Sequence, residues 1–124
     1  MMNSTALIYG VDLRNSNLSK EFIDRFYGLY PNTIFSMSDS MEQWCGLELV
    51  GTDPHNAMFG YVYALHEGLD PKLAIRYTQR SLVRIDPDET TKLTTMIPEC
   101  LDWYRIKVND PVPQLFMWEY VNIG

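Results

Sequence analysis

The sequence predicts an α+β or α/β domain in which a small mixed sheet of about four strands is covered by three to four helices. Three observations support this fold class. Short runs of β-branched and aromatic residues occur toward both ends of the chain. Longer segments between them carry apolar residues at helical spacing. Asp-Pro pairs at positions 53, 70 and 86 mark helix starts, because aspartate can cap a helix and proline suits its first turn.

Composition bounds the partners that the protein can have. The chain has 124 residues, of which 46% are hydrophobic and 21% charged, and we expect one globular domain spanning 1–124. Its formal net charge is -6. Nucleic acid backbones and anionic membranes would repel such a chain, so we expect neither as a partner and favour a protein, basic if charge guides it.

The two cysteines and the first ten residues of the chain indicate the cellular compartment in which we expect the protein. Cys45 and Cys100 lie far apart with no neighbouring His or Cys pattern, so we expect free thiols, no metal site and no cofactor. The first ten residues lack the basic start and apolar core of a signal peptide, and no apolar run is long enough to span a membrane. The sequence therefore favours a cytoplasmic protein.

The first part of the chain predicts strands on either side of one helix. Residues 6–13 form a strand candidate in which Gly10 indicates a bulge or a close backbone approach. Apolar residues at helical spacing predict a helix over 17–30, ended by the following proline. Short runs over 33–37 and 43–50 predict two further strands.

The stretch from Thr52 to Arg84 predicts a helical hairpin. Its first helix would begin at Pro54 and end near Gly68, and its apolar residues occupy more than one stripe. We therefore expect it to be the central, buried helix. The second would begin at Pro71 and end near Arg84.

The last part of the chain predicts a helix followed by a strand. Asp86 and Pro87 begin a helix that Pro98 should kink or shorten. The loop over 110–113, DPVP, is rigid, and 115–121, LFMWEYV, reads as a final strand with apolar residues on both faces.

Residues 52–92 resemble the C-terminal helical segment of the ribokinase-like sugar and nucleoside kinases, in particular the pseudouridine kinase branch. The resemblance is carried by small, aromatic and leucine positions, namely Ala57, Gly60, Tyr63, Ala64, Leu65, Gly68, Leu69 and Ala74, followed by DPDET at 86–90. It implies a kinase-like fragment that binds a nucleoside or a sugar, with or without phosphoryl transfer.

In that family a glycine-rich loop precedes the helix, holds the transferring phosphoryl group with its amides and supplies an aspartate as base. This chain has TDPHNA in its place. The corresponding anion loop would consist of Thr52, Asp53, His55 and Asn56, and the family's aspartate position falls on His55 or Asn56. Pro54 removes one of the amide donors that phosphoryl transfer needs.

Other catalytic motifs are missing from the sequence. It contains no phosphate-binding P-loop, no dinucleotide-type glycine fingerprint and no nucleophile elbow. The acidic group Asp86, Asp88 and Glu89 has two readings, since it can cap the following helix or present a binding patch to a basic protein. We therefore expect a protein without catalytic residues.

The final strand is the preferred contact element. Phe116, Trp118 and Tyr120 share one of its faces, and aromatic residues are enriched at interface hot spots as well as in cores. The other face carries Leu115, Met117, Glu119 and Val121. Either the strand is central in a two-sided helical sandwich, or its exposed edge binds a partner or a second copy through 115–121.

Taken together, these residues favour a small acidic binding protein without catalysis that docks on another macromolecule, as inhibitors, immunity proteins and accessory factors do. The alternative is the degenerate kinase-like fragment that binds a nucleoside or a sugar.

Overall fold

The computed structural model describes residues 2–27, 43–44, 46–66 and 85–122 of the chain. These residues form four strands and two helices. In chain order they are β1 (Met2–Asp12), α1 (Lys20–Phe26), β2 (Leu47–Asp53), β3 (Asn56–His66), α4 (Pro87–Trp103) and β4 (Gln114–Asn122). The fold class is α+β, as expected, although the described part of the chain contains two helices and not three to four.

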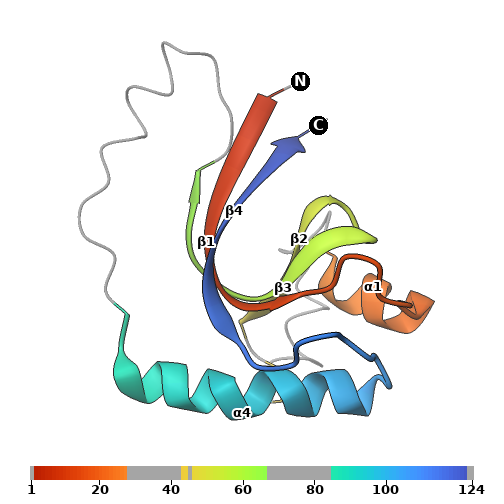
Figure 1. Ribbon diagram of the computed structural model, residues 1–124, viewed down its shortest axis with the longest axis vertical. Helices are drawn as coiled ribbons and strands as arrows, with labels where there is room; N and C mark the ends of the chain where they lie inside the picture. The colour runs from red at the N-terminus through yellow and green to blue at the C-terminus, as the bar shows by residue number, and fades with distance from the viewer. Residues whose placement is uncertain (1, 28–42, 45, 67–84, 123–124) are drawn as a thin grey trace.

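The strands form one sheet in the order β2-β3-β1-β4, and every neighbouring pair is antiparallel. The expectation of a mixed sheet is therefore wrong, because a chain that turns back at the short hairpin between β2 and β3 pairs its strands antiparallel. Both β1 and β3 bend sharply along their length (Figure 1). The β1–β3 register shifts between Leu7 and Ile8, and such irregularities increase the bend of a strand.

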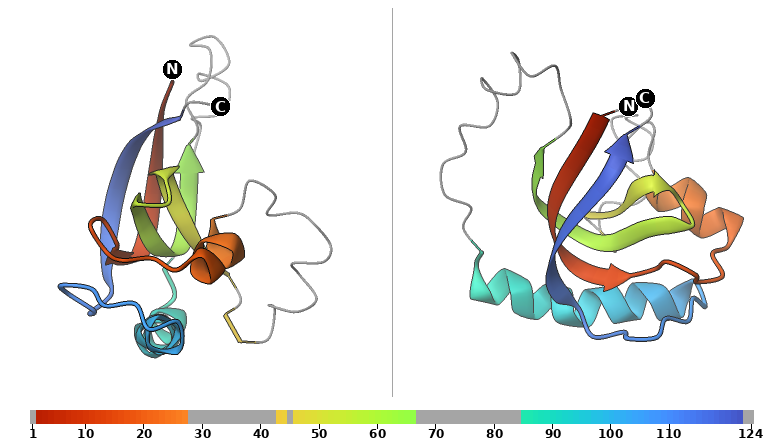
Figure 2. Two further views of the ribbon diagram at one scale, coloured as in Figure 1. Left: turned by 90° about the vertical axis from the view of Figure 1, so that its right-hand side faces the viewer. Right: turned by 45° about the horizontal axis from the view of Figure 1, so that its top comes forward.

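Both helices contribute to one core on the outer side of this bend. Figure 2 shows α4 end-on beneath the sheet, and Figure 1 shows it lying across the bent part of β1 and β3. Phe22 and Phe26 of α1 and Leu93 and Ile97 of α4 are buried there. They pack against alternating residues of β1, β2 and β3 and against Leu13 just after β1; the strand residues are Val11, Leu47, Leu49, Ala57 and Phe59.

A second, smaller core occupies the inner side of the bend. Its buried members are Ala6, Ile8, Val50 and Met58, and partly buried side chains from β3 and β4 pack around them, namely Val62, Phe116, Trp118 and Tyr120. None of its members comes from a helix. The sheet therefore buries this face largely by curling on itself, as a partly closed barrel does.

The helix starts follow from capping side chains. Ser19 is the N-cap of α1 and accepts a hydrogen bond at its Oγ from the amide of Phe22, at 3.2 Å. Asp86 is the N-cap of α4, with Pro87 in the first turn, and its Oδ1 accepts from the amide of Asp88 at 2.9 Å. The predicted start of α4 is confirmed. Pro98 lies inside the helix, which continues beyond it to Trp103.

The strongest disagreement with the sequence concerns the expected central helix, because Asn56–His66 is strand β3. Asp53 caps a hairpin turn and not a helix, since its Oδ1 accepts from the amide of His55 at 2.8 Å. An aspartate before a proline suits either role. The second expected helix and the strand over 33–37 lie outside the described residues.

Three other predictions for the strands can be compared with the structure. The first strand is confirmed and extends back to Met2. The strand predicted over 43–50 begins later, at Leu47, because Gly46 has a φ of 84° that strand residues do not adopt. The final strand is confirmed as β4, but it lies at the edge of the sheet and not in its centre.

Candidate functional site: the edge strand β4

The outer face of β4 exposes apolar side chains. Leu115 is 48% exposed, Met117 70% and Val121 37%. These three residues, together with Glu119 between them, form what we call the β4 outer face. Burial of large apolar side chains is the main favourable term in protein association, so a row of them left in solvent marks a candidate docking surface.

The backbone of β4 is also available along one side. β4 pairs with β1 over its whole length, and no other described strand pairs with it. An edge strand presents unpaired amide and carbonyl groups that can accept another strand. The exposed side chains and the unpaired backbone edge from Leu115 to Glu119 therefore belong to the same strand.

The opposite, inner face of β4 carries the aromatic residues that the sequence marked for partner binding. Phe116, Trp118 and Tyr120 are half-buried and pack against the inner core. The rings of Trp118 and Tyr120 stack at 6.5 Å between centroids. The Nε1 atom of Trp118 is buried and has no hydrogen-bond partner among the described residues. These aromatic side chains thus support the curled sheet more than they offer themselves to solvent.

An ion pair lies over the Trp118 ring. Arg14 binds the carboxylate of Asp12 through its Nε and Nη2 atoms, with Nη2 at 2.7 Å from Oδ2. The same guanidinium lies 5.2 Å from the ring centroid of Trp118. This contact connects the end of β1 to the middle of β4. The hydrogen bonds from Arg14 lower the pKa of the Asp12 carboxyl, against the opposing effect of its partial burial.

One hydrogen bond joins the two edges of the sheet. Thr52, at the end of β2, donates from its Oγ1 to the carbonyl oxygen of Val121 at 2.9 Å. The curl of the sheet therefore brings β2 and the last residues of β4 together, although they lie at opposite ends of the strand order. From Leu115 to Glu119 the edge of β4 makes no such hydrogen bond with the other described residues.

The loop that the kinase resemblance marked as an anion loop is the turn between β2 and β3. Asp53, His55 and Asn56 are exposed at this turn. The amide of His55 is already used by the Asp53 carboxylate, and the Tyr27 hydroxyl donates to the carbonyl of Thr52 at 2.9 Å. Burial raises the pKa of Tyr27, with a further contribution from the charge of Asp53. The turn is thus braced by contacts within the chain.

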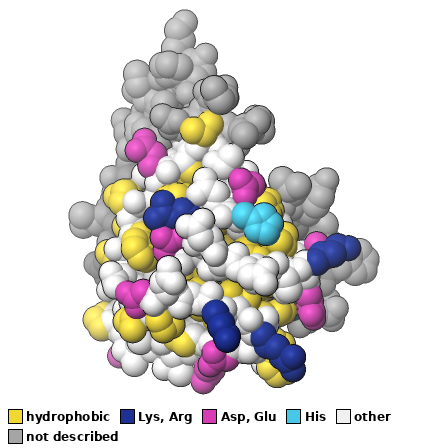
Figure 3. Space-filling view, turned by 45° about the vertical axis from the view of Figure 1, so that its right-hand side comes forward, with side chains coloured by type: hydrophobic (Ala, Val, Ile, Leu, Met, Phe, Trp, Pro, Cys, Tyr) yellow, Lys and Arg dark blue, Asp and Glu magenta, His cyan; other side chains and the backbone are white. Residues whose placement is uncertain are grey.

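The acidic group at the start of α4 performs the capping role. Asp86 is the cap, and Asp88 and Glu89 lie in the first turn, where carboxylates interact favourably with the helix dipole. On the face shown in Figure 3, described side chains of both charges lie among hydrophobic ones and do not gather into a patch of one sign. Charge alone therefore does not locate a docking surface on that face.

Cys100 is the cysteine that the structure describes, and it is a buried free thiol in α4. Burial raises its pKa to about 12. A thiol with this pKa is almost wholly protonated at neutral pH and is a poor nucleophile. Cys45 lies outside the described residues.

The described residues contain neither a grouped set of metal-ligating side chains nor a helix suited to crossing a membrane. Within these residues no three His, Cys, Asp or Glu side chains are grouped so that they could hold a metal ion. No described helix combines the length and the apolar character needed to cross a membrane.

Sequence reasoning singled out β4 but not its most exposed residue. Met117 and its neighbours alternate with the aromatic residues, and nothing in the sequence says which face the rest of the chain covers. The ion pair between Asp12 and Arg14 was also missed, although an aspartate can close a turn by accepting from the amide two residues later, as Asp12 does from Arg14.

Comparisons were made with protein-family models, with curated proteins and with solved structures, and none of them matches this chain. The resemblance to ribokinase-like kinases stays a hypothesis.

Proposed function

We propose that the protein is a non-catalytic binding protein that docks on another protein through the β4 outer face. The observation that carries this proposal is that Leu115, Met117 and Val121 remain exposed on an edge strand whose opposite face is packed. A sheet face that serves only solubility would carry polar residues at these positions. Inhibitors, immunity proteins and accessory factors act by docking of this kind.

The preferred partner is basic. The chain carries a net charge of -6, and Glu119 lies in the middle of the β4 outer face. A carboxylate among exposed apolar residues would be costly to bury against an apolar or acidic partner, but a lysine or arginine of a basic partner can pair with it. Long-range attraction by the net charge would also speed the encounter.

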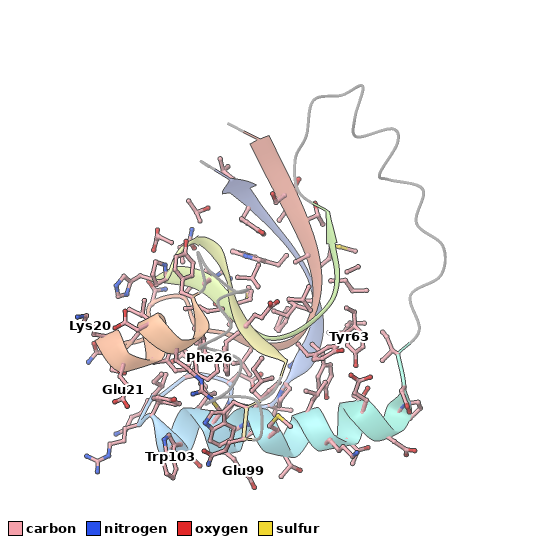
Figure 4. The ribbon with its side chains drawn as sticks, turned by 180° about the vertical axis from the view of Figure 1, so that it is seen from behind. Lys20, Glu21, Phe26, Tyr63, Glu99 and Trp103 are labelled. Atoms are coloured by element: carbon pink, nitrogen blue, oxygen red, sulfur yellow. The ribbon has the colours of Figure 1, made fainter. Side chains whose placement is uncertain are left out.

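Affinity capture with purified variants tests the proposal. Met117→Glu places a second charge on the β4 outer face, whereas Trp103→Glu changes a side chain of similar exposure, 65%, at the end of α4. Trp103 points away from the body of the molecule, and Phe26 points into it (Figure 4).

We expect the wild type and Trp103→Glu to retain a basic protein that Met117→Glu does not retain. Raising the salt concentration should release this protein from both. Equal retention by both variants would show that the β4 outer face is not the docking surface. Circular dichroism of each variant establishes that it remains folded.

A further inference from the structure

We infer that a second copy of this chain pairs with the free backbone edge of β4, antiparallel and centred on Met117, so that two four-stranded sheets join into one. This inference concerns the backbone edge, and it goes beyond the proposed docking of another protein on the side chains of the β4 outer face. It rests on three features: which backbone groups point outward, which register uses them, and which side chains that register brings together.

The hydrogen bond from Thr52 shows the direction of the backbone groups. Because Thr52 belongs to β2 and β1 lies on the other side of β4, the Val121 carbonyl that it contacts points away from β1. In an antiparallel strand the amide and carbonyl of one residue point the same way, and the direction alternates along the chain. The β1–β4 register is continuous, so Leu115, Met117 and Glu119 also direct their backbone groups outward.

Only one two-fold register between β4 and β4 of the second copy forms hydrogen bonds with the outward backbone groups of all three residues and leaves those of Val121 unused. With Met117 opposite Met117 of the second copy, Leu115 lies opposite Glu119 of the second copy, and each pair can exchange two hydrogen bonds. The carbonyl of Val121 is then left to Thr52. A register centred on Trp118 would instead require Val121 to pair with Leu115, in competition with the hydrogen bond from Thr52.

The side chains favour the same register. Centring on Glu119 would place two carboxylates directly opposite each other, which is destabilising in a sheet. Centring on Met117 separates them and places Glu119 beside Leu115. On the inner face it sets Phe116 opposite Trp118 of the second copy, and aromatic cross-strand pairs stabilise sheets. A two-fold interface must be self-complementary in this way.

Such a pairing also joins the two β4 outer faces. Leu115 and Met117 of both copies would then form one continuous apolar surface, and the docking surface proposed above would be enlarged without any change in fold. Self-pairing further covers the edge of β4, which would otherwise be a template for indiscriminate pairing with other chains.

Single cysteines along β4 test the register, in a Cys45→Ser background where the remaining Cys100 is buried. Residues opposite each other in a hydrogen-bonded pair have Cα atoms about 5.5 Å apart, which a disulfide can span. Two copies of residue 119 would be separated by roughly 13 Å in this register. We therefore expect Met117→Cys to form a disulfide dimer under mild oxidation, and Trp118→Cys and Glu119→Cys to form little.

Sedimentation of the purified wild-type chain over a range of concentrations tests whether the dimer exists. Met117→Pro provides the matched variant, because it removes an outward amide that β1 does not use, and edge strands tolerate proline at such positions. We expect the wild type to dimerise and Met117→Pro to remain a folded monomer. A monomeric wild type at every concentration, a dimeric Met117→Pro, or cross-linking strongest at another position would overturn the inference.

The dimer and the docking function can fail separately. Sedimentation uses the purified chain alone, whereas the capture experiment requires another protein and compares variants of the side-chain surface. A monomeric protein that still retains a partner through Met117 would refute the dimer and leave the proposed function standing.

Discussion

Gly10 of β1 and Gly60 of β3 lie directly opposite each other in the sheet. A Cβ atom built on Gly10 would fall 2.7 Å from the Cα of Gly60, and one built on Gly60 would fall 2.6 Å from the Cα of Gly10. Each would also press on a backbone carbonyl of the facing strand, that of Phe59 or that of Tyr9. The two backbones can approach this closely only because neither residue has a side chain.

We expect Gly10→Ala and Gly60→Ala each to lower the free energy of unfolding by about 1–3 kcal/mol, the usual cost of forcing extra atoms into a packed site. Urea denaturation followed by circular dichroism measures the change. Glu119→Ala, which also introduces alanine into a strand but at an exposed position, should have an effect within about 0.5 kcal/mol. Alanine tolerated at both glycines would contradict the close approach of β1 and β3.

The aromatic cluster between α1 and the sheet should dominate stability. Phe22 is fully buried, and its ring lies 4.8 Å from that of Phe26, 5.0 Å from that of Phe59 and 5.5 Å from that of Tyr104. We expect Phe22→Ala to cost about 3–5 kcal/mol, from lost burial and the cavity that remains. Trp103→Ala removes a larger ring that is 65% exposed and should cost far less. Comparable losses in thermal melts of the two variants would contradict the placement of α1 on the core.

The ion pair at the end of β1 gives a dependence on pH. Arg14 lowers the pKa of Asp12 in the folded protein, so this carboxylate stabilises the fold above its ordinary pKa of about 4 and loses that contribution as the pH falls through the lowered value. We expect Asp12→Asn to be slightly less stable at neutral pH and to lose less stability on acidification.

The size of this effect is limited, because both side chains are more than one-third exposed and solvent screens the pair. Denaturation midpoints measured across the acid range, in low and in high salt, would detect it. Asp24→Asn is the matched control, since it removes a carboxylate from the exposed side of α1. An unchanged acid dependence in Asp12→Asn would show that the pair does not contribute.

Cys100 should be unreactive while the protein is folded. Its pKa of about 12 leaves almost no thiolate at pH 8, and the side chain is inaccessible. In the Cys45→Ser background, we expect Ellman's reagent to label the thiol only after urea unfolds the chain. Rapid labelling of the native protein would indicate that α4 separates readily from the sheet.

Local signals in the sequence were enough to predict several elements of this fold. Asp86 and Pro87 begin α4, and the turn at 110–113 is closed by Asp110, whose Oδ1 accepts from the amide of Val112 at 3.1 Å. These features depend on side chains that contact their own neighbouring backbone, so a few consecutive residues contain the information.

The segment after Asp53 shows where local reasoning fails. Its apolar residues fit a helix with two stripes, but they also alternate, with Phe59, Tyr61 and Tyr63 turned to the helices and Met58 and Val62 to the inner core. An apolar segment covered on both faces satisfies both periods. Pairing with β2 from Asn56 to Tyr61 and with β1 from Met58 to His66 favours the strand, because it satisfies backbone groups of β3 that a helix would pair internally.

The candidate site depends on the tertiary structure in the same way. The sequence alone determined that 115–121 is a strand with apolar residues on both faces. It could not determine that β4 lies at the edge, or that the curled sheet covers Trp118 and leaves Met117 in solvent. Strand order and curvature arise from pairing between distant segments, and no single segment of the chain contains that information.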